Sequence, residues 1–119
     1  VASMVAFGYV RSYNRGSGTS YRSFSAFKRA VGPAGKGKAW HHIVEQSQIK
    51  KSGFLPKQIH NVKNMIAVDS ATHTRISGFY SSKPDFTNGL TVRNWLAGQS
   101  YGAQFKFGMD VLKNMGVVK

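Results

Sequence analysis

The chain has 119 residues, a length typical of one domain and too short for two separate hydrophobic cores. It carries 17 Lys and Arg against four Asp and Glu residues, a formal net charge of +13, which predicts a polyanionic partner or substrate, nucleic acid first. The absence of cysteine excludes disulfide frameworks, thiolate zinc sites and cysteine nucleophiles. With only four carboxylates, a two-metal centre built on three or four clustered acids is hard to assemble, so chemistry here must depend on histidine.

The first part of the chain differs in composition from the rest. Residues 1 to 22 combine an apolar start with a stretch of Gly, Ser, Arg and Tyr that has no clear period. We expect a linker or cell-entering segment, or a segment packed on the domain, and we expect the domain itself to span 23 to 119. The chain begins without Met and is expected to be part of a longer protein. No apolar run approaches the roughly 18 residues of a membrane span, so we expect no transmembrane segment.

In chain order, the sequence predicts a mixture of helices and short strands. Ser23 precedes a helical pattern that ends in basic residues, and the Gly-rich, basic stretch 32–38 follows as a loop. Ser70 is the expected N-cap of a helix that places His73 and Ser77 on one face. The expected strands are 39–45 and 64–69, and the expected helices are 23–31, 46–51, 71–80, 91–98 and 100–115, the last with Phe105, Met109, Leu112 and Met115 as its core stripe. We therefore predict a small α+β fold.

Two adjacent histidines, His41 and His42, stand near the end of the first expected strand. A hairpin followed by a helix can hold one divalent cation between a histidine at the end of the first strand and a histidine on the helix, here His73. The neighbouring histidine can then act as a general base towards water. Asn64, at the start of the second strand, could fasten the intervening loop through hydrogen bonds to its backbone.

At these residues the sequence resembles a family. The His41-His42 pair, Asn64 and a histidine nine residues later are similar to the motif of the HNH, or ββα-metal (His-Me finger), endonucleases. The wider strings 24–28, 40–46 and 59–61 also resemble the C-terminal nuclease domains of bacterial polymorphic toxins of the contact-dependent inhibition and Rhs type. The resemblance covers residues 23 to 83 well and the C-terminal helices less specifically. It implies a ββα-metal core with additional C-terminal helices.

The resemblance also implies a role for each motif residue. His41 and His73 would be metal ligands, His42 the general base and Asn64 the residue that orients the loop. Colicin-type nucleases have another histidine four residues after the helix histidine, where this chain has Ser77. Two imidazole ligands favour a weakly held Mg²⁺ over tightly bound Zn²⁺.

Other residues keep two interpretations. Glu45, the acid nearest the pair, either completes the site or pairs with a lysine, and His60 is expected to be a loop residue rather than a ligand. We expect contacts to phosphate from basic residues in the loops and on or after the motif helix. These are Lys36, Lys38, Arg75, Lys83 and Arg93.

The expected function is that of an antibacterial toxin nuclease that hydrolyses phosphodiester bonds, with DNA favoured over RNA as substrate. Delivered as part of a larger secreted or cell-surface bacterial protein, it would act as a monomer in the target-cell cytoplasm. An acidic immunity protein would restrain it in the producing cell. Two alternatives remain at this point: a metal-independent RNase acting on tRNA through a histidine pair, and a basic nucleic-acid-binding module without catalysis.

Overall fold

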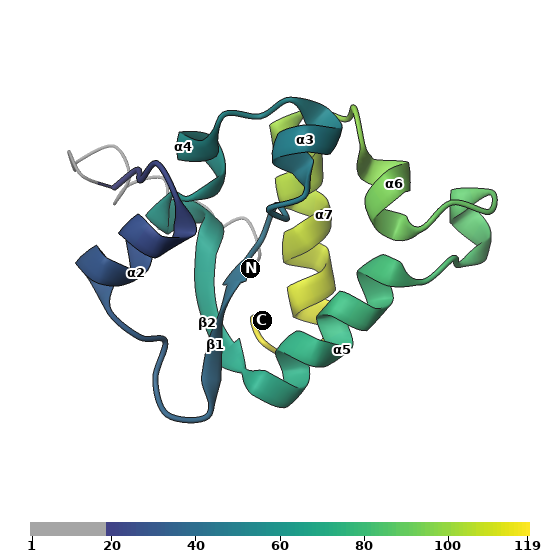
Figure 1. Ribbon diagram of the computed structural model, residues 1–119. Helices are drawn as coiled ribbons and strands as arrows, with labels where there is room; N and C mark the ends of the chain where they lie inside the picture. Colours follow the sequence, from purple (N-terminus) through teal and green to yellow (C-terminus); the bar gives the residue numbers. More distant parts are fainter. Residues whose placement is uncertain (1–18) are drawn as a thin grey trace.

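The computed structural model describes residues 19 to 119 (Figure 1). They form an α+β fold in which a two-stranded antiparallel sheet is surrounded by helices. The two strands are β1 (Lys38–His42) and β2 (Met65–Asp69). The α-helices are α2 (Phe24–Val31), α3 (Gln48–Ser52), α4 (Pro56–Ile59), α5 (Ser70–Ser81), α6 (Val92–Leu96) and α7 (Tyr101–Asn114), and two 3₁₀ turns are η1 (Val62–Asn64) and η2 (Asp85–Thr87).

The two strands of the sheet are connected by a long segment, residues 43 to 64. Lys38 pairs with Asp69 and His42 pairs with Met65, so the histidine pair lies where the hairpin opens towards the connecting segment. Helices α3 and α4 and the turn η1 occupy that segment (Figure 1). Because successive side chains of a strand point to opposite faces, His41 and His42 project from different sides of β1.

Helix α5 begins immediately after β2 and packs against both strands. Our expectation that Ser70 caps this helix is wrong, because Asp69 occupies the N-cap position and Ser70 is the first helical residue. The Ser70 hydroxyl instead donates to the Gly37 carbonyl oxygen at 3.1 Å, and the Ser70 amide donates to the same oxygen at 3.0 Å. These bonds tie the start of α5 to the loop before β1.

The core lies between α5, α6, α7 and one face of the sheet. Its central contact is the approach of α7 to the chain just after β1, where Gly108 faces the backbone of Ile43 so closely that a Cβ would lie 2.4 Å from the Ile43 carbonyl oxygen. Of the expected stripe on α7, Met109 and Leu112 are buried, whereas Phe105 and Met115 are partly buried at the edge of the core. The buried apolar cluster comprises Ile43, Val68, Ile76, Tyr80, Val92, Leu96, Met109, Val111 and Leu112.

Within the described part, the seven expected helices and strands are present in the expected order. Six of them are shorter than predicted, α5 extends one residue further at each end than the predicted 71–80, and α4 was not predicted. Ser23 caps α2 as expected, its hydroxyl accepting from the Ala26 amide at 3.0 Å. Residues 19 to 22 pack on the domain, since Ser20 forms a β-bridge with Asn61 and the Tyr21 amide donates to the His60 carbonyl oxygen. The rest of the expected linker, 1 to 18, lies outside the described residues. Among residues 19 to 119, no helix has the length and apolar character needed to cross a membrane.

Candidate active site

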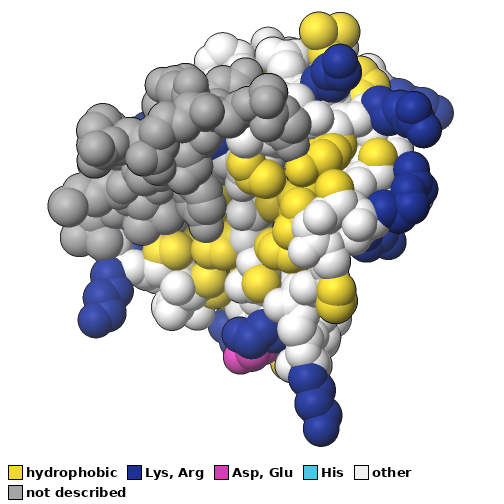
Figure 2. Space-filling view, turned by 90° about the vertical axis from the view of Figure 1, so that its left-hand side faces the viewer, with side chains coloured by type: hydrophobic (Ala, Val, Ile, Leu, Met, Phe, Trp, Pro, Cys, Tyr) yellow, Lys and Arg dark blue, Asp and Glu magenta, His cyan; other side chains and the backbone are white. Residues whose placement is uncertain are grey.

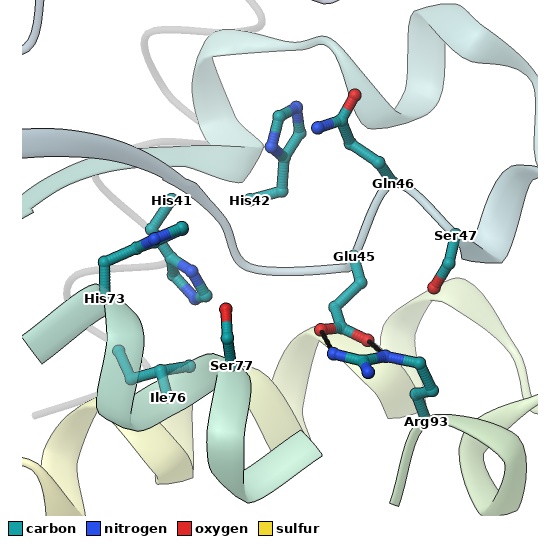
Figure 3. Close-up of a pocket in the computed structure, with 9 residues that line it drawn as sticks. All are labelled: His41, His42, Glu45, Gln46, Ser47, His73, Ile76, Ser77 and Arg93. Carbon is teal, nitrogen blue, oxygen red and sulfur yellow. Dashed lines mark hydrogen bonds and ion pairs between the residues drawn. The ribbon is translucent and has the colours of Figure 1, made fainter. Parts of the chain in front are cut away.

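A pocket opens beside the end of β1, between the chain that follows this strand and α5 (Figure 3). Its volume is about 340 Å³. Three of the four histidines of the chain, His41, His42 and His73, line it. The remaining lining residues are Glu45, Gln46, Ser47, Ile76, Ser77 and Arg93. The structure therefore brings together the histidines that the sequence singled out, although His42 and His73 are 31 positions apart (73 − 42).

The rings of His41, in β1, and His73, in α5, lie next to each other where the helix packs against the strand. Their ring centroids are 5.6 Å apart and the ring planes meet at 74°. His41 is 4% exposed, and its Nε2 atom is buried without a hydrogen-bond partner among the described residues. Ser77, one helical turn after His73, lies beside the two rings (Figure 3). An unsatisfied buried imidazole nitrogen costs free energy, and a bound ion or water is one way in which it could be satisfied.

The two imidazoles provide part of a cation site. Among residues 19 to 119 there is no cluster of three or more His, Cys, Asp or Glu side chains placed to hold a metal ion. A closed structural zinc site needs four protein ligands, so these residues do not fit one. They fit a cation that takes its other ligands from water or from a substrate phosphate, as Mg²⁺ commonly does.

His42 has a different partner. Its Nε2 atom lies 3.2 Å from Nδ1 of His60, the residue that ends α4. Phe24 of α2 packs its ring edge-on against His42, with centroids 4.8 Å apart, and is parallel to the ring of His60. His60 lies outside the helices and strands, as expected, but it is only 5% exposed and its ring meets that of His42.

Burial keeps both histidines of the pair neutral. It lowers the pKa of His41 to about 4, with a further contribution from the nearby His73. It lowers the pKa of His42 to about 3, and the neighbouring imidazoles of His60, His41 and His73 act in the same direction. At pH 7 both rings are therefore neutral, with one ring nitrogen unprotonated, the state that a general base or a metal ligand requires.

Asn64 fastens the segment between the strands, as expected. Its Oδ1 accepts from the Val44 amide at 2.8 Å, and its Nδ2 donates to the carbonyl oxygens of Val44 and Ile59, each at 3.0 Å. The side chain is fully buried. Asn64 therefore fixes the chain that leaves the histidine pair and the end of α4 in one arrangement.

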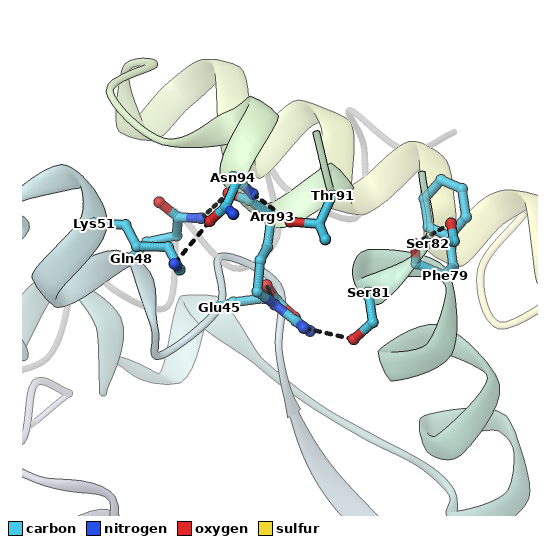
Figure 4. Close-up of polar contacts among 9 residues, drawn as sticks. All are labelled: Glu45, Gln48, Lys51, Phe79, Ser81, Ser82, Thr91, Arg93 and Asn94. Carbon is cyan, nitrogen blue, oxygen red and sulfur yellow. Dashed lines mark hydrogen bonds and ion pairs between the residues drawn. The ribbon is translucent and has the colours of Figure 1, made fainter. Parts of the chain in front are cut away.

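Glu45 pairs with an arginine rather than with a lysine. Arg93 of α6 donates from Nε and Nη2 to the two carboxylate oxygens, at 2.9 and 2.7 Å, and from Nη1 to the Ser81 hydroxyl at 2.6 Å (Figure 4). The hydrogen bond and the charge of Glu45 raise the pKa of Arg93 above its usual value. This bidentate pair forms the wall of the pocket opposite the histidines (Figure 3). Both oxygens of Glu45, which we considered as a metal ligand, therefore accept hydrogen bonds from Arg93.

The five basic residues that we expected to contact phosphate lie in different parts of the structure. Arg93 lines the pocket, but Lys38 is 3.7 Å from Asp69 and Arg75 donates to the Met115 sulfur at 3.3 Å. Lys36 and Lys83 are exposed.

On one face of the molecule, basic side chains lie around a central apolar area and little acidic surface is visible (Figure 2).

The sequence missed His60 as a neighbour of the site because a single histidine in a turn has no characteristic spacing. The only signal was its position in the string 59–61, which belongs to the family resemblance. The Glu45 to Arg93 pair, separated by 48 positions, gave no local signal at all.

Comparisons with protein-family models, with curated proteins and with solved structures found no match to this chain.

Proposed function

We propose that this chain is a nuclease that hydrolyses phosphodiester bonds in the pocket of His41, His42 and His73. The observation that carries the proposal is the meeting of His41 and His73, from β1 and α5, with the buried Nε2 of His41 unpartnered among the described residues. The net charge of +13 adds a general attraction for a polyanion. We further propose that β1, β2 and α5 are the ββα-metal core of an HNH-like nuclease.

In this proposal each side chain has a limited task. His42, neutral at pH 7, takes a proton from the attacking water. Arg93, oriented by Glu45, offers its remaining N–H groups to a phosphate oxygen. The imidazoles of His41 and His73 would hold the cation. A divalent cation bound there, for which we favour Mg²⁺, would offset negative charge that develops on the phosphate and the leaving oxygen.

DNA is the favoured substrate because of the family resemblance, since backbone phosphate is common to DNA and RNA. We propose that the domain is the toxic part of a larger bacterial protein, secreted or displayed at the cell surface, and that it acts in the cytoplasm of the target cell. An acidic immunity protein would then cover the basic surface in the producing cell. Failure of the product of the adjacent reading frame to bind the domain and to protect cells would contradict that part.

A metal-independent RNase is the second candidate. It is favoured by the absence of a third metal-ligating side chain in the described part of the site. In that mechanism two histidines of the pocket would serve as base and acid, and the ribose 2′-hydroxyl would be the nucleophile. The histidines would be the same, but the substrate would have to be RNA.

The test is cleavage of plasmid DNA and of total tRNA, each with Mg²⁺ and with excess EDTA. The variants are His42→Ala and His73→Ala, and Thr74→Ala is the control because Thr74 is exposed, is adjacent to His73 and does not line the pocket. We expect Mg²⁺-dependent nicking of plasmid by the wild type and by Thr74→Ala only. Cleavage of tRNA in EDTA would favour the RNase. Salt-sensitive binding that survives His42→Ala, with no strand scission under any condition, would favour a non-catalytic binding module.

A further inference from the structure

His42, the proposed base, forms a buried pair with His60, a residue that has no role in the proposed chemistry. The Nε2 atom of His42 and the Nδ1 atom of His60 are 3.2 Å apart, and their ring planes are nearly perpendicular, at 77°. The ring of Phe24 lies near both, edge-on to His42 with centroids 4.8 Å apart and parallel to His60 with centroids 6.3 Å apart. The rings of Phe24, in α2, and of His60, directly after α4, thus restrict the orientation of the imidazole that we assign as the base.

We propose that His60 is a positioning residue, which accepts a hydrogen bond from His42 Nε2–H and so leaves His42 Nδ1 free to take a proton from water. The inference rests on the proposed nuclease function for its catalytic meaning. The hydrogen bond itself can be measured without any activity.

The argument depends on what a neutral imidazole can do. One ring nitrogen carries a proton and donates, and the other is an acceptor. Since His42 and His60 meet through one nitrogen each, one of them must donate to the other. If His60 donated, His42 would carry its proton on Nδ1 and could not act as a base through that atom. If His60 accepts, His42 is fixed in the tautomer that has a basic Nδ1.

The position of His60 is itself well determined. Its amide donates to the Pro56 carbonyl oxygen at 2.8 Å and its carbonyl oxygen accepts from the Tyr21 amide at 2.8 Å. Asn64 bonds to the preceding residue, Ile59, and also to Val44, which is two residues after His42. The same buried amide therefore fixes both backbones that present the two imidazoles, so their contact is a stable feature of the fold.

A purely structural role for His60 predicts that any side chain of similar size would serve. Asn and Leu allow this to be tested, because their side chains have nearly the same shape and Oδ1 of Asn lies close to the position of Nδ1 in histidine. We expect His60→Asn to keep most of the wild-type kcat and His60→Leu to lose about 10- to 100-fold in kcat with little change in KM, as is common when a partner that orients a histidine is removed. Equal kcat values for the two variants, at equal thermal stability, would overturn the proposal.

The second measurement is the ¹⁵N spectrum of the histidine side chains in the folded protein at neutral pH, which distinguishes protonated from unprotonated ring nitrogens. We expect His42 to be protonated at Nε2 in the wild type and in His60→Asn, and to populate both tautomers in His60→Leu. Protonation of His42 at Nδ1 in the wild type would overturn the assignment. If the wild type cleaved no nucleic acid, the proposed nuclease function would fail, whereas the same spectrum would still decide whether His60 sets the tautomer of His42.

Discussion

Asn64 is the buried side chain that joins the chain after the histidine pair to the end of α4. Three hydrogen bonds join it to Val44 and Ile59, and all are buried. Removing a buried partner leaves the opposite groups unsatisfied, at a cost of about 1 to 3 kcal/mol for each group. We expect Asn64→Ala to lower the free energy of unfolding by about 3 kcal/mol or more, measured by urea denaturation.

Asn114 provides the control for that substitution. It is exposed near the end of α7, and Asn114→Ala should change the free energy of unfolding by less than about 0.5 kcal/mol. Similar effects of the two substitutions would mean that the Asn64 hydrogen bonds do not determine the conformation of the segment between the strands.

The Glu45 to Arg93 ion pair connects the site to α6. The side chains of Glu45 and Arg93 are 16% and 26% exposed, so the pair is shielded more than a typical surface ion pair. A double-mutant cycle with Glu45→Gln and Arg93→Gln should give a coupling energy of about 1 to 2 kcal/mol in the free energy of unfolding. The cycle for Lys106→Gln and Asp110→Asn, an exposed pair on α7, should give less than about 0.5 kcal/mol. Equal coupling in the two cycles would contradict the account.

At the scale of whole elements, the contact between α7 and the chain just after β1 depends on one glycine, Gly108. A Cβ on Gly108 would lie 2.4 Å from the Ile43 carbonyl oxygen and 2.8 Å from Ile43 Cγ2, so Gly108→Ala must displace backbone. We expect a loss of about 1 to 3 kcal/mol or more in the free energy of unfolding. Because Ile43 directly follows the histidine pair, activity should fall as well.

The same helix contains its own control. Gly102 has no atom within 4 Å of the position that a Cβ would take. Gly102→Ala should therefore stabilise the protein by about 0.5 to 1 kcal/mol through helix propensity. If Gly108→Ala were stabilising like Gly102→Ala in thermal and urea denaturation, the close approach of α7 to Ile43 would be wrong.

The sequence predicted elements better than it predicted the contacts between them. Periodicity and caps identified α2, α5, α6 and α7 because these signals are local, and Ser23 caps its helix as expected. The Ser70 cap failed because Asp69 ends β2 and directly precedes α5, so no separate loop residue is available. The family spacing grouped His41, His42, Asn64 and His73, whereas the partners His60 and Arg93 depend on packing between distant segments, which no spacing rule describes.

For the molecule as a whole, the buried imidazoles predict how stability depends on pH. The pKa values of His41 and His42 are lowered to about 4 and about 3 in the folded state. The unfolded chain, with pKa values near 6.5, binds more protons below that pH, so stability is present in full above about pH 6.5 and falls as the pH decreases towards 4. Each of the two groups should contribute about 1.4 kcal/mol per pH unit within this window.

Urea denaturation between about pH 6 and pH 5 measures the effect of the buried imidazoles, because Asp and Glu residues titrate mostly below that range. Burial also lowers the pKa of His60, which adds to the same slope. His42→Gln removes one of the two groups and should reduce the slope of stability against pH. A free energy of unfolding that stayed constant through this interval in the wild type would show that the histidine pair is not buried in the neutral form.

The most direct test of the central claim, hydrolysis by water at the histidine pocket, is the chemical identity of the ends that cleavage leaves. Plasmid DNA and tRNA would be digested with wild type, His42→Ala and Thr74→Ala, and the terminal groups of the fragments identified by mass spectrometry. We predict fragments with one linear phosphate end and one hydroxyl end, formed by wild type and Thr74→Ala and absent with His42→Ala. Fragments of RNA ending in a 2′,3′-cyclic phosphate, or fragments formed equally by His42→Ala, would contradict the account.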